Sequence, residues 1–174
     1  MVGKVRGEVE SFEALQFNVL KKLEDVKDPE IPLVSVIDLG MISDVQLGRD
    51  GSVKIKALPT FVGCPALEII KKNIKEAIQM VEGVKDVEVE FVYDPPWTSD
   101  RISEKGKENL KQFGIAPPPK FIEEKELWDV ECPYCGSHYT TMENLFGPTA
   151  CRSILYCKSC KNPFEAMKPI SNLM

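Results

Sequence analysis

Four cysteines near the end of the chain place the tightest limit on how it can fold. They form two Cys-x2-Cys pairs with 21 residues between them, Cys132 with Cys135 and Cys157 with Cys160. Two such turns can present four thiolates to one tetrahedral ion at about 2.3 Å. The ion supplies folding free energy that a domain of about 45 residues cannot obtain from its core alone. We therefore expect a closed, structural Zn²⁺ site, with disulfides, unmetallated thiols or a single iron as the alternatives.

Two further residues lie beside this cysteine box. Cys151 is either a small buried residue or an accessory thiol next to the metal-binding turns, available for metal handover or redox exchange. His138 lies three residues after Cys135. We expect it to be a structural polar residue, with a substitute metal ligand as the alternative.

The composition excludes several classes of function. With 22 basic and 27 acidic side chains the net charge is −5, which argues against a general nucleic-acid binder. A single histidine rules out most self-contained catalytic sites, so we expect no enzyme activity. No apolar run approaches the roughly 20 residues that span a bilayer, and the first residues lack the apolar core of a signal peptide. We expect a cytoplasmic protein without membrane attachment, in which metal ligation by cysteines is favoured over disulfides.

Hydrophobic periodicity upstream of the cysteine box predicts a small α+β domain with helices packed on a mixed sheet. The expected helices span 9–26, 65–81 and 103–113, and the expected strands span 41–47, 53–58 and 84–93. Three consecutive prolines, residues 117–119, predict a stiff spacer. We therefore divide the chain into an α+β domain over 1–116, a Pro-rich linker over 117–126 and a zinc ribbon over 127–174.

Cys64 is the one cysteine outside the C-terminal region. It falls where the second helix is expected to begin, and free N–H groups at a helix N-terminus stabilise a thiolate. Thr60 belongs to a loop whose backbone is expected to approach this thiol. The candidates to accompany it are Asp28, Glu30 and Asp38, although each alone is more often a cap or a solvated side chain. The alternative for Cys64 is a buried, inert thiol.

These residues resemble the elements of two known families. Asp28-Pro29-Glu30, Asp38-Leu39-Gly40 and Thr60-x3-Cys64-Pro65 resemble the hallmark elements of a SufT-like iron–sulfur assembly domain. Over about residues 15–170, the chain resembles the D-subunit family of the phenylacetyl-CoA 1,2-epoxidase system (PaaD, also labelled PaaJ). That likeness rests on Pro96-Trp97-Thr98, on Phe113-Gly114-Ile115-Ala116-Pro117-Pro118 and on the cysteine ribbon.

The resemblance implies an accessory protein in phenylacetate breakdown that supports iron or iron–sulfur loading of a multicomponent oxygenase. Its implied partners are oxygenase or reductase subunits and iron–sulfur proteins, with a homodimer left open. Cys64, with the residues around it, would bind iron or a cluster transiently or contact a client.

Three alternatives remain. One is an integral, non-catalytic subunit of the oxygenase. Another is a thiol-redox enzyme using Cys64 and Cys151, which we disfavour because the sequence offers no second cysteine near Cys64. The last is a zinc-ribbon nucleic-acid adaptor, which the charge disfavours.

Overall fold

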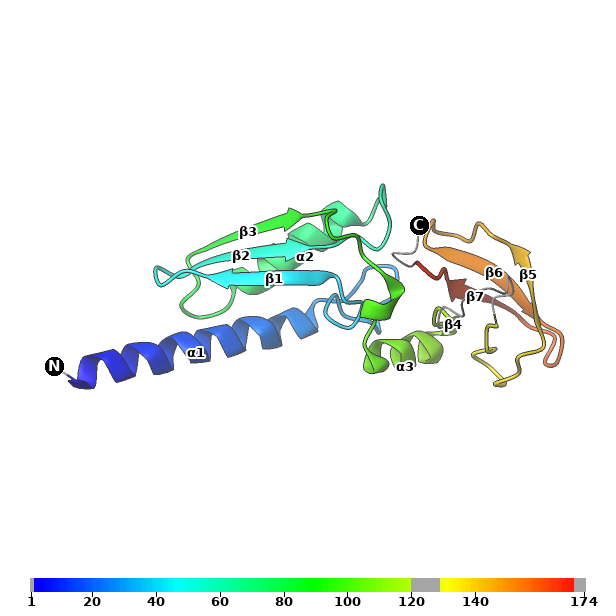
Figure 1. Ribbon diagram of the computed structural model, residues 1–174, viewed down its shortest axis with the longest axis horizontal. Helices are drawn as coiled ribbons and strands as arrows, with labels where there is room; N and C mark the ends of the chain where they lie inside the picture. Colours follow the sequence, from blue (N-terminus) through cyan, green and yellow to red (C-terminus); the bar gives the residue numbers. More distant parts are fainter. Residues whose placement is uncertain (1, 120–128, 171–174) are drawn as a thin grey trace.

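The computed structural model describes residues 2–119 and 129–170, with side chains from residue 12 onward. Figure 1 shows two small sheets arranged along the long axis of the molecule and linked through a short helix, α3. Within the described residues, no helix is both long enough and apolar enough to cross a membrane. The architecture confirms the expected α+β class with a second, cysteine-bearing sheet.

The first sheet is mixed, as expected. Strands β1 (Ile42–Leu47) and β2 (Ser52–Ala57) form an antiparallel hairpin, and β3 (Asp86–Phe91) pairs in parallel with β2. The crossover between β2 and β3 contains helix α2 (Leu67–Gln79), and helix α1 (Val2–Asp25) runs along the same sheet (Figure 1). The helix order and strand order therefore match the sequence-based expectation.

One face of this sheet forms the main core. Alternate residues of β2 and β3 are buried and pack with the apolar stripes of both helices. The fully buried members include Ile55 of β2 and Ile74 of α2. The opposite face is charged, with the Nζ of Lys54 at 3.4 Å from Glu88 and 3.7 Å from Glu90.

Element boundaries differ from the expectation at a few places. Helix α1 begins at Val2 instead of residue 9, and β3 is shorter than the expected 84–93. Helix α2 begins at Leu67 instead of Pro65. The reason is a tighter turn before the helix, in which the Leu67 amide donates to the carbonyl of Cys64 at 3.3 Å.

Helix α3 (Glu104–Phe113) follows a 3-10 turn, η1 (Ser99–Arg101). The hydroxyl of Ser103 caps it by accepting from the Gly106 amide at 2.9 Å. Gly114 ends it in the left-handed conformation at φ 90°, which glycine adopts at little cost. Both ends of the predicted helix 103–113 are thus confirmed.

The second sheet has the order β4-β7-β6-β5. Its strands are β4 (Ile115–Ala116), β5 (Thr140–Asn144), β6 (Arg152–Cys157) and β7 (Pro163–Met167). Strand β4 precedes the predicted spacer yet pairs in parallel with β7. The second sheet therefore contains strands from both sides of the expected boundary at residue 116. Residues 120–126 of the expected linker lie outside the described residues.

Further contacts fix the second sheet against the first domain. Met167 is buried in the main core, and Ile170 packs against it. The Ser99 amide donates to the carbonyl of Ile170 at 3.0 Å, and the Ile170 amide donates back to the Ser99 hydroxyl at 3.2 Å. Within the first domain, Trp97 holds the loop before η1 against the core: it is only 4% exposed, and its indole Nε1 donates to the carbonyl of Leu39 at 2.8 Å.

Candidate metal centre and the Cys64 loop

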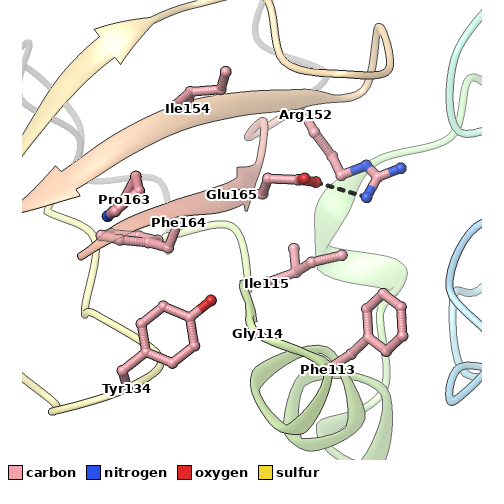
Figure 2. A pocket seen from close by; sticks show the side chains of 9 residues that line it. All are labelled: Phe113, Gly114, Ile115, Tyr134, Arg152, Ile154, Pro163, Phe164 and Glu165. Carbon is pink, nitrogen blue, oxygen red and sulfur yellow. Dashed lines mark hydrogen bonds and ion pairs between the residues drawn. The ribbon is translucent and has the colours of Figure 1, made fainter.

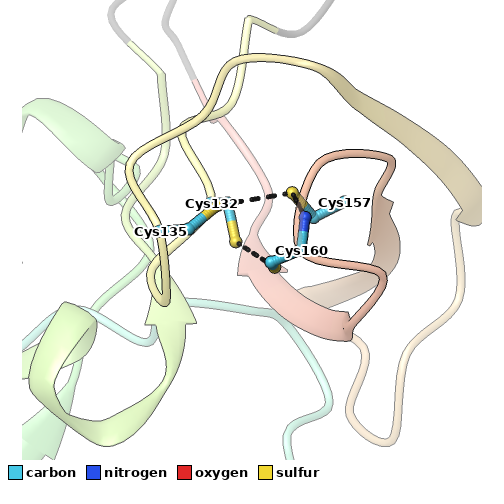
Figure 3. Close-up of side chains that lie close together, drawn as sticks. All are labelled: Cys132, Cys135, Cys157 and Cys160. Carbon is cyan, nitrogen blue, oxygen red and sulfur yellow. Dashed lines mark hydrogen bonds between the residues drawn. The ribbon is translucent and has the colours of Figure 1, made fainter.

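The four ribbon cysteines converge on one point (Figure 3). Their Sγ atoms all lie within 4.8 Å of one another. The Sγ atoms of Cys132 and Cys160 are 3.7 Å apart, and those of Cys135 and Cys157 are 3.6 Å apart. A tetrahedron with metal–sulfur bonds of about 2.3 Å has edges of about 3.8 Å, so the set fits a single tetrahedral ion. The expected four-cysteine cluster is confirmed, and all six cysteines of the chain are free thiols.

The two turns that carry these cysteines share one backbone design. The Gly136 amide donates to the carbonyl of Cys132, and the Lys161 amide donates to the carbonyl of Cys157, both at 2.9 Å. The donor residue of each turn has a positive φ, 71° at Gly136 and 61° at Lys161. In each turn the hydrogen bond closes a loop that contains both cysteines of the pair.

The thiols of the cluster differ in their affinity for protons. The Cys160 amide lies 3.5 Å from the sulfur of Cys157 and, as the main cause, lowers the pKa of that thiol to about 6. Burial raises the pKa of the Cys132 thiol to about 12. A metal ion that binds all four sulfurs must therefore displace protons, as thiolate sites generally do.

His138 lies outside this cluster. Its Nδ1 is 2.7 Å from a carboxylate oxygen of Asp129, and both side chains are exposed. The structural interpretation of His138 is therefore favoured over the substitute ligand.

Cys64 lies in the loop between β2 and α2 and is half-buried. Burial is the main reason why the pKa of its thiol is raised, although the Ala66 amide, which donates to the sulfur, opposes the shift. The negative charges of Glu30, Cys151 and Asp28 raise this pKa further. The expectation of a net stabilised thiolate is therefore wrong, because burial and the nearby negative charges outweigh the one amide that donates to the sulfur.

The loop around Cys64 is open to approach. Gly63 has a φ of 84°, and no atom lies within 4 Å of the position that a Cβ would occupy there. Val62 is 72% exposed, and Phe61 is also exposed. Thr60 lies in the same loop and is partly exposed. The thiol therefore belongs to a surface segment that a small ligand or a protein can reach.

Two of the three expected carboxylates lie near Cys64. Asp28 accepts backbone hydrogen bonds from the amides of Glu30 at 2.8 Å and Ile31 at 3.0 Å, so it also holds its own turn. Burial raises the pKa of Asp28 more than these two bonds lower it. Glu30 is partly exposed and lies 3.5 Å from the guanidinium of Arg152.

Asp38 has a different environment. It is 5% exposed, and its two oxygens accept from the hydroxyls of Ser35 at 2.8 Å and Ser103 at 3.0 Å. The ammonium of Lys105 lies 3.9 Å away. These contacts tie the 35–40 turns to the start of α3. The role of Asp38 beside Cys64 stays a prediction.

Arg152 is the residue that the sequence did not reveal. It is 6% exposed and links the two parts of the chain: Nη1 donates to Glu165 at 2.7 Å, and Nη2 lies 3.5 Å from Glu30. Its neighbour Cys151 comes close enough to Cys64 to raise the pKa of that thiol. Cys151 is therefore a second cysteine whose charge acts on Cys64, although 86 residues separate the two in the sequence. For Arg152, the one available signal in the sequence was its position at the start of an apolar segment, because a buried arginine needs an acidic partner.

A pocket of about 320 Å³ includes both members of the Arg152–Glu165 ion pair in its lining (Figure 2). The end of α3, strand β4 and strands β6 and β7 form it. Its aromatic lining includes Phe113, Tyr134 and Phe164. No cysteine or histidine lines it, and its one carboxylate, Glu165, is paired with Arg152.

Comparison with known families gives two matches along the chain. Residues 17–91 match a family model described as iron-sulfur cluster assembly protein. Residues 116–168 match a model described as PaaD zinc beta ribbon domain. The first match contains the Cys64 loop, and the second contains the four-cysteine cluster and Cys151.

Individual relatives agree with these matches. "Fe-S protein maturation auxiliary factor YitW" of Bacillus subtilis is 41% identical over 95 residues, which cover 55% of this chain and 92% of that protein. A crystal structure of a domain of unknown function, DUF59, from Bacillus anthracis is similar, with a TM-score of 0.53 and 32% identity over 56% of this chain and 92% of that chain.

A further relative spans both parts. The Escherichia coli protein named as the D subunit of a putative 1,2-phenylacetyl-CoA epoxidase is 39% identical over 149 residues, which cover 85% of this chain and 89% of that protein. The likeness includes both the iron–sulfur assembly region and the ribbon, in the same order. The chain therefore belongs to the D-subunit family of phenylacetyl-CoA epoxidases.

Proposed function

We propose that this protein is a non-catalytic accessory factor that supports the loading of iron or iron–sulfur clusters into a multicomponent oxygenase of the phenylacetyl-CoA epoxidase type. The observation that carries the proposal is the position of Cys64, a half-buried thiol on an open loop within the iron–sulfur assembly region. The named relatives include iron–sulfur maturation factors and an epoxidase subunit, which supports both parts of the proposal.

In this proposal, Cys64 is the transient ligand for iron or a cluster, or the contact with the client. Thr60 lies in the same loop, and the carboxylates of Asp28 and Glu30 are near enough to interact with the sulfur. Asp38 contributes by holding the neighbouring turns against α3. A raised thiol pKa is consistent with this use, because the sulfur stays protonated until a cation or a partner displaces the proton.

The ribbon has a different role. We infer that its four cysteines hold Zn²⁺, since four thiolates at tetrahedral spacing are a set that Zn²⁺ favours. When bound, the ion supplies folding free energy, and the closed set leaves no coordination position for a substrate. The ribbon would then serve as a rigid platform for docking, with oxygenase or reductase subunits and iron–sulfur proteins as partners in the cytoplasm.

The small number of reactive groups supports the non-catalytic role. The single histidine, His138, is engaged with Asp129, and it lies on the ribbon. Within the described residues, no nucleophile is within hydrogen-bonding distance of a histidine base, as an acyl-transfer or hydrolytic site requires. The net charge of −5 also argues against a nucleic-acid partner.

The experiment that tests this proposal compares Cys64→Ser with the intact protein during production of the oxygenase. We expect C64S to keep its ribbon metal and its helical content, yet to leave the oxygenase low in iron and in activity. The exposed lysine variant K72M on α2 serves as the control and should behave like the intact protein. Normal iron content and activity with C64S would overturn the proposal.

A second candidate is an integral, non-catalytic subunit of the oxygenase. The exposed apolar residues Phe61, Val62 and Phe146 favour a lasting protein contact. The ratio of the two proteins distinguishes the candidates. Activation by amounts well below one chain per oxygenase supports the accessory factor, whereas stable one-to-one purification with the oxygenase supports the integral component.

A further inference from the structure

We propose that Cys151 of the ribbon provides a second sulfur ligand to the site at Cys64, so that iron is held between the two parts of the chain. This inference rests on the proposed function, because it concerns the same transient site. It adds a ligand from a different domain, separated from Cys64 by 86 intervening residues in the sequence.

The first step is the fixed position of Cys151. Its carbonyl accepts from the Lys168 amide at 3.0 Å, which ties it to the end of β7. Its sulfur lies 3.2 Å from the hydroxyl of Thr149, and the same hydroxyl accepts from Arg152 Nε at 2.8 Å. The turn that carries Cys151 is therefore held by backbone and side-chain contacts on both sides.

The second step is the link across the two domains. Arg152 follows Cys151 directly, and its guanidinium lies between Glu165 of the ribbon and Glu30 of the first domain. Figure 2 shows the ion pair to Glu165. The 3.5 Å contact with Glu30 places the Cys151 turn against the segment 28–31, which itself lies beside Cys64. Two half-buried thiols, one in each domain, are thus linked through the Arg152–Glu30 contact and the acidic segment that acts on Cys64.

The third step concerns charge. We call the contact between segment 28–31 of the first domain and the Arg152–Glu165 pair of the ribbon the seam. It contains the carboxylates of Asp28, Glu30 and Glu165, and Arg152 is the cation that the structure pairs with two of them, Glu30 and Glu165. The thiols of Cys64 and Cys151 also repel each other when both are ionised, which raises the pKa of Cys64. A divalent cation relieves this repulsion, and two thiolates with one or two carboxylates suit a metal such as Fe²⁺.

The looseness of this site fits transient binding. Among the described residues, the ribbon cysteines are the one group of three or more ligand atoms that lie within 4.8 Å of one another. The donors at the seam are therefore less closely gathered than those in the ribbon. Closing them around an ion requires movement of the Gly63 loop, which has open space around it. Such a rearrangement lowers affinity and favours release to a client.

The experiment uses the full chain with zinc in its ribbon, kept reduced and free of oxygen, and titrates it with Co²⁺ as an absorbing probe for Fe²⁺. We expect one Co²⁺ to bind with sulfur-to-metal charge-transfer absorption while the zinc is retained. Cys64→Ser and Cys151→Ser should each weaken this binding by more than about 10-fold, the lower end of the effect of supporting residues around a metal. The control T141V, on the exposed strand β5, should bind like the intact protein.

The outcomes separate this inference from the proposed function. Weaker binding by C64S together with unchanged binding by C151S overturns the inference and leaves the proposed function in place. Unchanged binding by both variants overturns the inference and excludes Cys64 as the iron ligand, which leaves the contact with the client as its role in the proposed function. A measurement on the intact chain needs no substitution: bound Co²⁺ should protect Cys64 and Cys151 together from alkylation. Protection of Cys64 alone contradicts the inference even if C151S does not fold.

Discussion

Arg152 offers the sharpest test of how the two domains are held together. We consider the substitution Arg152→Met, which keeps much of the aliphatic stem but removes the guanidinium. In the intact protein this group donates to Glu165 at 2.7 Å and to Thr149 at 2.8 Å, and it lies 3.5 Å from Glu30. The variant therefore leaves two carboxylates at the seam without their cation.

The expected loss follows from these contacts. A hydrogen bond to a charged group contributes about 1.5–3 kcal/mol, and removing one partner of a fully buried pair costs about 3–5 kcal/mol. The side chains of Glu30 and Glu165 are 31% and 34% exposed, so water replaces part of what they lose. We therefore expect the free energy of unfolding to fall by about 2–3 kcal/mol, which is below the fully buried limit.

The assay is urea unfolding followed by circular dichroism, with zinc present throughout. The midpoint should fall by about 1 M for a slope near 2–3 kcal/mol per molar, and the slope should stay unchanged. The control K72M removes one side of an exposed pair on α2 and should change stability by less than about 0.5 kcal/mol. A midpoint for R152M that matches K72M would refute the reasoning. Adding E30Q to R152M should cost less than E30Q alone, because the shared contact is already gone.

Three more outcomes follow from single residues or from the ribbon metal. Trp97→Phe removes the indole donor to Leu39 and should lower the free energy of unfolding by about 1–3 kcal/mol; an unchanged urea midpoint would contradict this. Because the pKa of Cys64 is raised, the rate of its alkylation should increase only at a pH above the ordinary pKa of a thiol. C151S or E30Q removes a negative charge and should shift the midpoint of this pH profile down. A pH profile that is unshifted in both variants would argue that neither residue lies near Cys64. Removal of the ribbon metal should increase amide exchange in β5–β7 while β1–β3 stay protected, and equal protection in both forms would show that the metal does not hold the ribbon.

The local features of the fold could be predicted from the sequence because they depend on neighbours in the chain. The cap by Ser103 and the stop at Gly114 need only residues within one helix. Each ribbon turn needs only a Cys-x2-Cys pair and a residue that accepts a positive φ. The alternation in β2 and β3 likewise predicts which side chains face the helices.

The seam could not be predicted in the same way, because it depends on contacts between distant segments. Arg152 and Glu30 are 122 positions apart, and no local pattern links them. The same limitation explains the error about Cys64. A helix N-terminus is visible in the sequence, but burial and the charges of Glu30 and Cys151, which raise the pKa of the thiol, come from the tertiary structure.

The geometry of the two thiol sites indicates an order of events. The four ribbon sulfurs already stand at tetrahedral spacing, whereas the donors near Cys64 must still be drawn together. An ion therefore fills the ribbon first, because that site needs little rearrangement. A metal held by Cys157, the last residue of β6, would also stabilise this strand, which begins with Arg152 directly after Cys151. Since Arg152 places the Cys151 turn against Glu30, we expect the seam at which we propose transient iron binding to depend on prior binding of a metal in the ribbon.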